Sequence, residues 1–235
     1  MIALILNSGI GSRMRGVLGG NPKCLINIHE GVPLLGHQIE IIRKSGIRNI
    51  IITTGYKSHE ITSYVSDNYQ KIEFIKFIHN PYFAITNYIY SIFLCLSHLM
   101  DDIILVHGDL FFSESVFSNI LNQDASTVAV DTTTLLNEKD FKAKIKDGQI
   151  IEISTMLKGE DCNNCQPLYK LYQKDWGPWA EMIKYFCEHN KRKAYAEEAL
   201  NLVLNEINLF PFDLKGDLCM EIDTPEDLRM LKERI

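Results

Sequence analysis

Apolar runs alternate with helical patterns through the first half of the chain. Largely apolar runs are typical of strands covered on both faces, and we predict four of them, at residues 2–6, 49–53, 73–79 and 103–106. Apolar positions at helical spacing predict three helices between or beside these strands, at residues 34–45, 58–68 and 86–99. Gly46 ends the first of these helices, and Ser58 is the expected N-cap of the second.

Strands and helices that alternate in this way predict an α/β fold. Right-handed βαβ units would build a Rossmann-like mixed, mainly parallel sheet flanked by helices. Ligands bind such sheets beyond the carboxyl ends of the strands. We therefore look for chemistry in the segments that follow the strands, at residues 7–14, 55–56, 80–87 and 108–109.

The second half of the chain has a different pattern. Residues 126–130 form a β run, and the β runs 141–146 and 149–154 are joined by Asp147-Gly148, a pair typical of a type I′ hairpin turn. Helices are predicted at residues 175–189, at residues 194–204 and after Thr224-Pro225. No repeat or linker divides the sequence, so we expect one domain over residues 1–235. The hairpin and helices of about 131–205 would form a small insertion over the site.

Composition and charge narrow the choice of partners. The 235 residues carry 24 basic and 30 acidic side chains, and this net charge of −6 argues against a surface that binds nucleic acid. No apolar run approaches the ~20 residues of a membrane span, and residues 1–6 are too short for a signal peptide, so we expect a cytoplasmic protein with no membrane contact. Six cysteines are too few for a disulfide scaffold, and Cys162-x-x-Cys165 lacks the second ligand pair of a structural zinc site.

The strongest chemical signal directly follows the first predicted strand. In the segment LNSGIGSRM (residues 6–14), Gly9 and Gly11 let backbone N–H groups approach an anion closely. Arg13 and Lys23 supply the countercharge that phosphates need. A dinucleotide fingerprint would need glycine in place of Met14, and a P-loop would need Gly-Lys-Ser/Thr. The segment therefore predicts a triphosphate-binding loop, with a plain turn as the alternative.

The pattern L-x-x-G-x-G-x-R-[ML] with a downstream Pro-Lys resembles the signature of the sugar-nucleotidyltransferase superfamily. Within it, nearly the whole chain is most similar to the small phosphocholine-type cytidylyltransferases. Three further stretches carry the resemblance: residues 80–91 (NPYFAITNYIYS), 106–110 (VHGDL) and 221–227 (EIDTPED). Two stretches depart from the family. Asn7-Ser8 replaces the usual alanines or alanine-glycine near the expected nucleobase, and residues 16–20 (GVLGG) replace an L-T-P-T-like segment.

The resemblance implies a nucleotidyl transfer. An oxygen of a substrate phosphate or phosphonate attacks the α-phosphorus of a nucleoside triphosphate, and pyrophosphate leaves in line. No general base is needed, because the enzyme's task is to position two anions and neutralise their charge. The resemblance assigns Arg13 and Lys23 to catalysis. The residues expected to bind the nucleotide follow the first strands: Leu6, Asn7, Ser8, Gly9, Gly11, Ser12, Gly55, Thr86 and Asn87.

The resemblance also implies a Mg²⁺ cofactor bound by Asp109 and Asp223, with Glu221 as the reserve ligand. Carboxylates suit this ion, which prefers oxygen ligands and bridges phosphates. Apart from the resemblance, two other interpretations stay open. Asp109 could lie in a surface turn, and Asp223 could interact with the dipole of the helix that follows it.

The acceptor side is less defined, and we predict Tyr88, Lys142 and Glu198 as its substrate-binding residues. Aromatic side chains would suit a cationic head group, although each could equally belong to the core: Tyr82, Phe83, Tyr88, Tyr90, Trp176 and Trp179. The pair Glu197-Glu198 falls where the choline-type relatives place an acidic substrate-side residue, and we select Glu198. Lys142 shares one hairpin face with two other lysines, a pattern typical of a solvated face; alternatively it holds an acceptor phosphate or carboxylate.

We therefore expect a Mg²⁺-dependent cytidylyltransferase whose partners are CTP and a small phosphorylated or phosphonylated polar molecule. The acceptor classes are phosphocholine-like molecules, aminoalkylphosphonates and amino-acid phosphates, which would place the enzyme in surface polysaccharide or lipid head-group biosynthesis. A hexose-1-phosphate uridylyl- or thymidylyltransferase is the first alternative, but it usually carries a longer sugar-binding insertion. The sequence does not decide the oligomeric state, and a homodimer stays open.

Two further alternatives belong to other classes. A GT-A-type glycosyltransferase would need Asp-x-Asp after the fourth strand, where Asp109 is followed by Leu110 and Phe111. A non-catalytic nucleotide-binding regulator would not need the combined set of two cations and two carboxylates that the resemblance assigns.

Overall fold

Four parallel strands position the predicted phosphate loop. The computed structural model describes residues 1–69, 75–136 and 138–235. In these residues the main sheet has nine strands, and one half of it runs in the order β6 (Ile103–His107), β1 (Ile2–Asn7), β4 (Asn49–Thr54) and β5 (Ile75–His79). Every residue of β1 is buried, because β4 and β6 pair with it on both sides in parallel register and helices cover both faces of the sheet. Residues 73–74 of the expected third strand lie outside the described residues.

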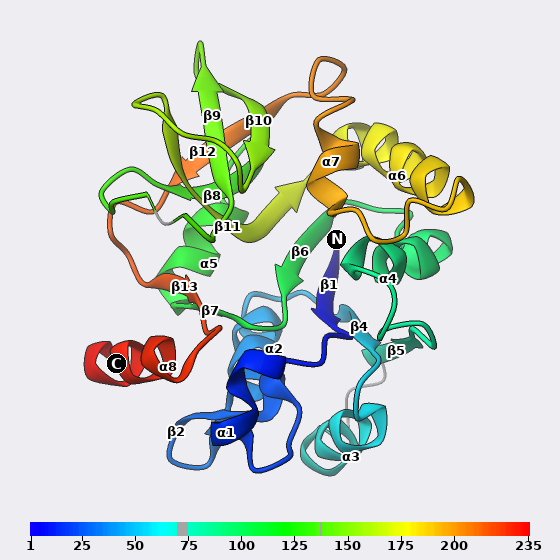
Figure 1. Ribbon diagram of the computed structural model, residues 1–235, viewed down its shortest axis with the longest axis vertical. Helices are drawn as coiled ribbons and strands as arrows, with labels where there is room; N and C mark the ends of the chain where they lie inside the picture. Colours follow the sequence, from blue (N-terminus) through cyan, green and yellow to red (C-terminus); the bar gives the residue numbers. More distant parts are fainter. Residues whose placement is uncertain (70–74, 137) are drawn as a thin grey trace.

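The other half of the sheet is mostly antiparallel. Strand β11 (Cys162–Leu171) pairs antiparallel with β6, β8 (Ser126–Asp131) and β9 (Lys142–Lys146). The hairpin partner β10 (Gln149–Ser154) and the strand β12 (Leu209–Asp213), which runs parallel to β8, complete this half. The predicted Rossmann-like mixed sheet is confirmed. However, residues 162–171 of the expected insertion form an interior strand of the sheet, as Figure 1 shows.

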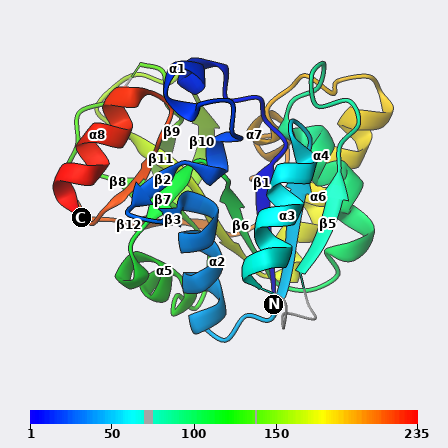
Figure 2. The same cartoon turned by 90° about the horizontal axis from the view of Figure 1, so that it is seen from below.

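Helices cover both faces of the sheet, and each face has its own apolar core. One core is covered by α4 (Tyr88–Cys95), α6 (Gln173–Glu188) and α7 (Ala196–Leu200). The opposite core is covered by α2 (Leu34–Lys44), α3 (Ser58–Asn68) and α5 (Glu114–Leu121). In Figures 1 and 2, α4 and α6 lie on one side of β1 and β6, and α2 and α5 lie on the other.

A third, smaller core holds the segment after the phosphate loop against the end of the chain. It contains residues of the short helix α1 (Arg15–Leu18), strand β2 (Asn27–His29) and helix α8 (Pro225–Arg234). The two-residue strand β3 (Val32–Pro33) pairs with β2. Helix α8 starts as predicted, because the Thr224 side chain accepts a hydrogen bond from the Asp227 backbone N–H.

Several predicted helix ends need correction. Ser58 is not an N-cap: Lys57 holds that position with a φ of 51°, and the Ser58 hydroxyl donates to Thr54 Oγ1 at 2.9 Å. The helix predicted over 86–99 is shorter, since α4 ends at Cys95 and gives way to the 3₁₀ turn Leu96–His98. The helix predicted over 194–204 is reduced to α7, with turns after it. No helix in the described parts of the chain is long and apolar enough to cross a membrane.

Candidate active site

A cleft of ≈ 380 Å³ opens at the carboxyl ends of β1 and β6. Its walls include most of the predicted phosphate loop together with both predicted metal ligands: Leu6, Asn7, Gly9, Gly11, Ser12, Arg13, Lys23, Asn87, Asp109 and Asp223. A second hollow of ≈ 170 Å³ adjoins the cleft, and Ser8 and Thr86 line it. Of the nine predicted nucleotide-binding residues, only Gly55 lines neither space.

Two glycines matter here because other groups approach them closely. A Cβ on Gly11, whose φ is +63°, would lie 2.9 Å from Lys23 Cβ, so the absence of a side chain lets the loop lie against Lys23. A Cβ on Gly55 would lie 2.5 Å from the Ser8 carbonyl oxygen and 2.6 Å from Phe83 Cβ. The absence of a side chain at Gly55 therefore lets Ser8 of the predicted phosphate loop and Phe83 both pack closely against the Gly55 backbone.

Lys23 lies between the two predicted metal ligands. It begins the 3₁₀ turn Lys23–Leu25, and its Nζ donates to Asp109 Oδ2 at 2.8 Å and to Asp223 Oδ1 at 2.5 Å. Arg13 Nη1 donates to the other oxygen of Asp223, Oδ2, at 2.7 Å. The two cations predicted for catalysis and the two carboxylates predicted for metal binding thus form one cluster, although Arg13 and Asp223 lie 210 positions apart.

The opposite charges in this cluster stabilise the ionised forms of Lys23 and Asp109. Burial alone would lower the pKa of Lys23, but the charges of Asp109 and Asp223 outweigh it, so the pKa of Lys23 is raised. Burial alone would raise the pKa of Asp109, yet the Lys23 ammonium outweighs that effect and lowers it. Both groups are therefore charged at neutral pH.

A small accessory sheet, separate from the main sheet, brings Asp223 to Asp109. Asp109 follows β6 and precedes β7 (Leu110–Phe112), which pairs antiparallel with β13 (Cys219–Glu221). The backbone N–H of Ile222 also donates to the Asp109 carbonyl at 2.8 Å. The strand before Asp223 thus lies in a different sheet from the strand before Asp109. The convergence comes from β7, which continues the chain beyond the end of the main sheet.

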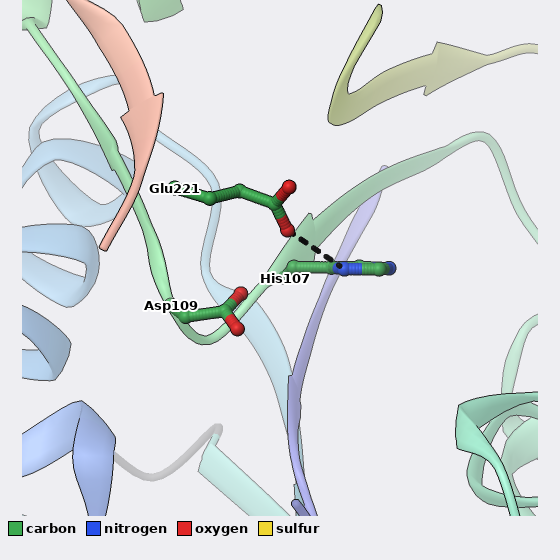
Figure 3. A group of neighbouring side chains, drawn as sticks. All are labelled: His107, Asp109 and Glu221. Atoms are coloured by element: carbon green, nitrogen blue, oxygen red, sulfur yellow. Dashed lines mark ion pairs between the residues drawn. The ribbon is translucent and has the colours of Figure 1, made fainter. Parts of the chain in front are cut away.

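The donor set of this corner fits Mg²⁺. Asp109 and Asp223 each contact the same ammonium, so their oxygens are far closer than the roughly 10 Å beyond which one coordination shell could not join them. Figure 3 shows Glu221 and His107 beside Asp109; one potential ligand atom from each of these three side chains lies within 4.8 Å of the others. Asp109 and Asp223 could hold the ion, with Glu221 close enough to join them.

His107 is a site residue that the sequence reasoning did not select. Its Nδ1 lies 3.8 Å from Glu221 Oε1, drawn as a dashed line in Figure 3. Burial alone would lower the pKa of His107, but the neighbouring carboxylates of Glu221 and Asp109 raise it overall. Burial, together with the charge of Asp109, raises the pKa of Glu221 despite the nearby imidazole. The sequence could have indicated His107 as a site residue, because it directly precedes the pair Gly108-Asp109 after the fourth predicted strand.

Two buried nitrogens on the cleft wall lack a hydrogen-bond partner among the described residues: Asn7 Nδ2 and His107 Nε2. A buried donor without a partner costs free energy, so native proteins rarely leave one unless a ligand or water satisfies it. Both residues line the cleft beside the phosphate loop, where they suit a ligand rich in oxygen acceptors.

On the acceptor side, Tyr88 lies on the cleft wall as predicted, and its hydroxyl is held from behind. It donates to Glu197 Oε2, while the Tyr169 hydroxyl donates to Glu197 Oε1 at 2.9 Å. Phe141 and Tyr195 complete an aromatic wall, with ring centroids 5.1 Å apart, and the Tyr195 ring lies 6.0 Å from that of Tyr88. Glu197 is therefore the buried carboxylate behind this aromatic wall.

The placements of Glu198 and Lys142 differ from their predicted roles. Glu198 is exposed and lies outside the cleft walls, and its carboxylate accepts the Tyr195 backbone N–H at 2.8 Å, which caps α7. Lys142 is 2% exposed, and its Nζ donates to the backbone oxygens of Glu138, at 3.2 Å, and Thr155, at 2.5 Å. It therefore holds the segments that border the cleft instead of lining it. Trp176 and Trp179 are core residues.

Comparisons with known proteins agree with this geometry. A model of the MobA-like NTP transferase domain matches residues 3–196. The choline-phosphate cytidylyltransferase of Streptococcus pneumoniae is 27% identical over 99% of this chain and 97% of its own. The CTP:phosphoglutamine cytidylyltransferase of Campylobacter jejuni is 22% identical over 100% of both. A solved structure of CTP:phosphocholine cytidylyltransferase from Streptococcus pneumoniae matches with a TM-score of 0.81 at 21% identity, covering 99% of this chain and 98% of the other. That likeness shows a shared fold.

Proposed function

Because the chain belongs to the MobA-like NTP transferase domain family and is a nucleotidyltransferase, we propose that it is a Mg²⁺-dependent cytidylyltransferase. It would transfer CMP from CTP to a small phosphorylated or phosphonylated polar molecule and release pyrophosphate. The observation that carries the proposal is the cluster in which Lys23 joins Asp109 and Asp223 beneath the glycine loop. The cytidylyltransferase relatives, which span nearly the whole chain, support CTP as the donor.

Arg13 and Lys23 would hold the phosphates of CTP in the cleft. An oxygen of the acceptor phosphate attacks the α-phosphorus and forms the new P–O bond. The bond from that phosphorus to the oxygen bridging the β-phosphorus breaks, and the electron pair leaves with pyrophosphate. When bound, Mg²⁺ would neutralise phosphate charge at Asp109 and Asp223. Because the attacking phosphate oxygen is already anionic, this chain needs no residue to remove a proton from it.

The acceptor would lie against the aromatic wall of Tyr88, Phe141 and Tyr195. A cation attracted by such ring faces gains further from a carboxylate nearby, and Glu221 lies on the same cleft. The three acceptor classes that we favour each carry an amine or quaternary ammonium group besides the phosphate or phosphonate: phosphocholine-like molecules, aminoalkylphosphonates and amino-acid phosphates. His107 Nε2, on the wall of the same cleft, would supply a hydrogen-bond donor for the phosphate or phosphonate of the acceptor.

A pyrophosphate-release screen tests the proposal. It crosses CTP, UTP, ATP and GTP, each with Mg²⁺, with phosphocholine, phosphoethanolamine, aminoethylphosphonate, amino-acid phosphates, glycerol phosphate and hexose 1-phosphates. We expect release with CTP and one of the nitrogen-containing acceptors, and loss of release when the metal is chelated. Equal or faster release with UTP or ATP across the acceptors, or a preference for hexose 1-phosphates, would contradict the proposal.

A further inference from the structure

Ser8 belongs to the phosphate loop, but its side chain borders the smaller hollow beside the main cleft. The hollow and the cleft are continuous at Leu6, Gly9 and His107, which line both. A nucleotide with its phosphates at Gly11 and Lys23 would have this hollow within reach of its base. Leu6 and Phe83 offer apolar walls for a flat ring, and Ser8 is one of the polar groups.

A chain of hydrogen bonds sets the direction of the Ser8 hydroxyl. The backbone N–H of Tyr82 donates to Asn80 Oδ1 at 2.9 Å, which fixes which side of the Asn80 amide is the oxygen. The amide nitrogen Nδ2 therefore faces Ser91 and donates to its Oγ at 3.0 Å. Ser91 in turn donates to Ser8 Oγ at 3.0 Å. Asn80 and Ser91 are each 1% exposed, so water does not compete for these bonds.

This relay leaves Ser8 with a proton to donate. Ser91 Oγ accepts from the Asn80 amide and donates its own proton to Ser8 Oγ, so the Ser8 proton points away from Ser91. No described residue accepts a hydrogen bond from Ser8 Oγ. The free side of Ser8 borders the hollow, where a bound base would supply the acceptor.

We propose that Ser8 is a specificity-determining residue whose hydroxyl donates a hydrogen bond to the nucleobase and favours cytosine over uracil. The inference rests on the proposed function, because it takes the hollow as the base site of a CTP-using enzyme. Cytosine carries an acceptor at ring position N3, where uracil carries an N–H. A hydroxyl whose proton is already directed outward donates to the N3 atom of cytosine and meets a second donor in the N3–H of uracil. The family resemblance places alanine or glycine at this position, so the donor is a feature of this chain.

Binding of CTP and UTP tests the inference without any knowledge of the acceptor. Isothermal titration calorimetry with Mg²⁺ gives both dissociation constants for the wild type, Ser8→Ala, Ser91→Ala and the double variant. We expect the preference for CTP to fall about tenfold in Ser8→Ala, the loss typical of one neutral hydrogen bond. Ser91→Ala should lose part of the preference, because the Ser8 hydroxyl then rotates freely. The double variant should lose no more than Ser8→Ala, since the two residues act as one unit.

Ser126 provides the matched control. It is also buried, and its hydroxyl donates to Asp175 Oδ2 at 2.6 Å, away from both hollows. Ser126→Ala should lower the melting temperature and leave the ratio of the two dissociation constants unchanged. If Ser8→Ala does not fold, Ser8→Cys keeps the size while weakening the donor, and the preference should still fall.

The outcomes separate this inference from the proposed function. A wild type that prefers CTP, with an unchanged ratio in a folded Ser8→Ala variant, overturns the role of Ser8 alone. A wild type that prefers UTP or a purine nucleotide overturns the proposed function and this inference with it.

Discussion

The two sides of the cleft use their charged residues in different ways. On the predicted nucleotide side, charged groups in the segments that follow β1 and β6 face the cleft: Lys23, Arg13 and Asp109 pair with one another or with Asp223 there. On the acceptor side, charged groups that are prominent in the sequence stabilise the protein itself. Lys142 holds two backbone carbonyls, and Glu198 caps its own helix.

The difference follows from topology. Parallel strands end at one edge, and the segments after them have few backbone hydrogen bonds to make with the sheet, so their polar side chains face a ligand site. The hairpin β9–β10 and the loops beside it have exposed backbone groups of their own. Lys142 donates to the carbonyls of Glu138 and Thr155 in these segments, and Glu198 accepts the Tyr195 backbone N–H at the start of α7. Charge next to a parallel strand end is thus a stronger functional signal than charge on a hairpin.

The largest expected effect comes from the two carboxylates of the nucleotide side. Asp109→Asn and Asp223→Asn keep the side-chain size but remove a negative charge that Mg²⁺ would need, so turnover should fall by about 10³. Glu221→Gln should be milder. Asp161→Asn is the control, because Asp161 is exposed and pairs with Lys144 away from the cleft. Turnover with CTP and the preferred acceptor measures the effect, and equal losses in Asp109→Asn and Asp161→Asn would contradict it.

A smaller effect is expected from the acceptor side. Glu197→Gln removes the carboxylate that accepts from both Tyr88 and Tyr169, so Tyr88 loses its fixed position on the cleft wall. The KM for the acceptor should rise about tenfold, the cost of one hydrogen bond to a charged group, while the KM for CTP stays unchanged. The neighbouring variant Glu198→Gln should leave both values unchanged. If Glu198→Gln raised the acceptor KM and Glu197→Gln did not, the original sequence prediction would stand instead.

The smallest expected effect on turnover comes from the hairpin lysines Lys142 and Lys144. For these two residues we compare the stability of the variants. Lys142→Met removes the buried ammonium that donates to the carbonyls of Glu138 and Thr155, so the free energy of unfolding should fall by about 1–3 kcal/mol. Lys144→Met changes a partly exposed side chain that pairs with Asp161, and thermal melts should detect no change. Equal melting temperatures for the two variants would show that Lys142 does not hold these segments.

The charged residues of the predicted nucleotide side could be selected from the sequence because their signals are local. Arg13 and Asp109 each lie in a segment that follows a buried strand, so each could be placed at the sheet edge from its neighbours in the sequence. The acceptor side depends on contacts between distant residues. Glu197 is buried because Tyr88 and Tyr169, 109 and 28 positions away, both point at it. A five-residue helix such as α7 gives no pattern from which to tell Glu197 from Glu198.

The central claim is that Lys23, held between Asp109 and Asp223, acts on the phosphates of CTP, and one comparison of turnover tests it most directly. Lys23→Met is measured beside Lys144→Met, with thermal melts for both. The loss of one electrostatic donor at a reacting phosphate should lower the turnover of Lys23→Met by ~10²–10³, with Lys144→Met at the wild-type rate and both variants folded. Wild-type turnover in a folded Lys23→Met variant would contradict the account.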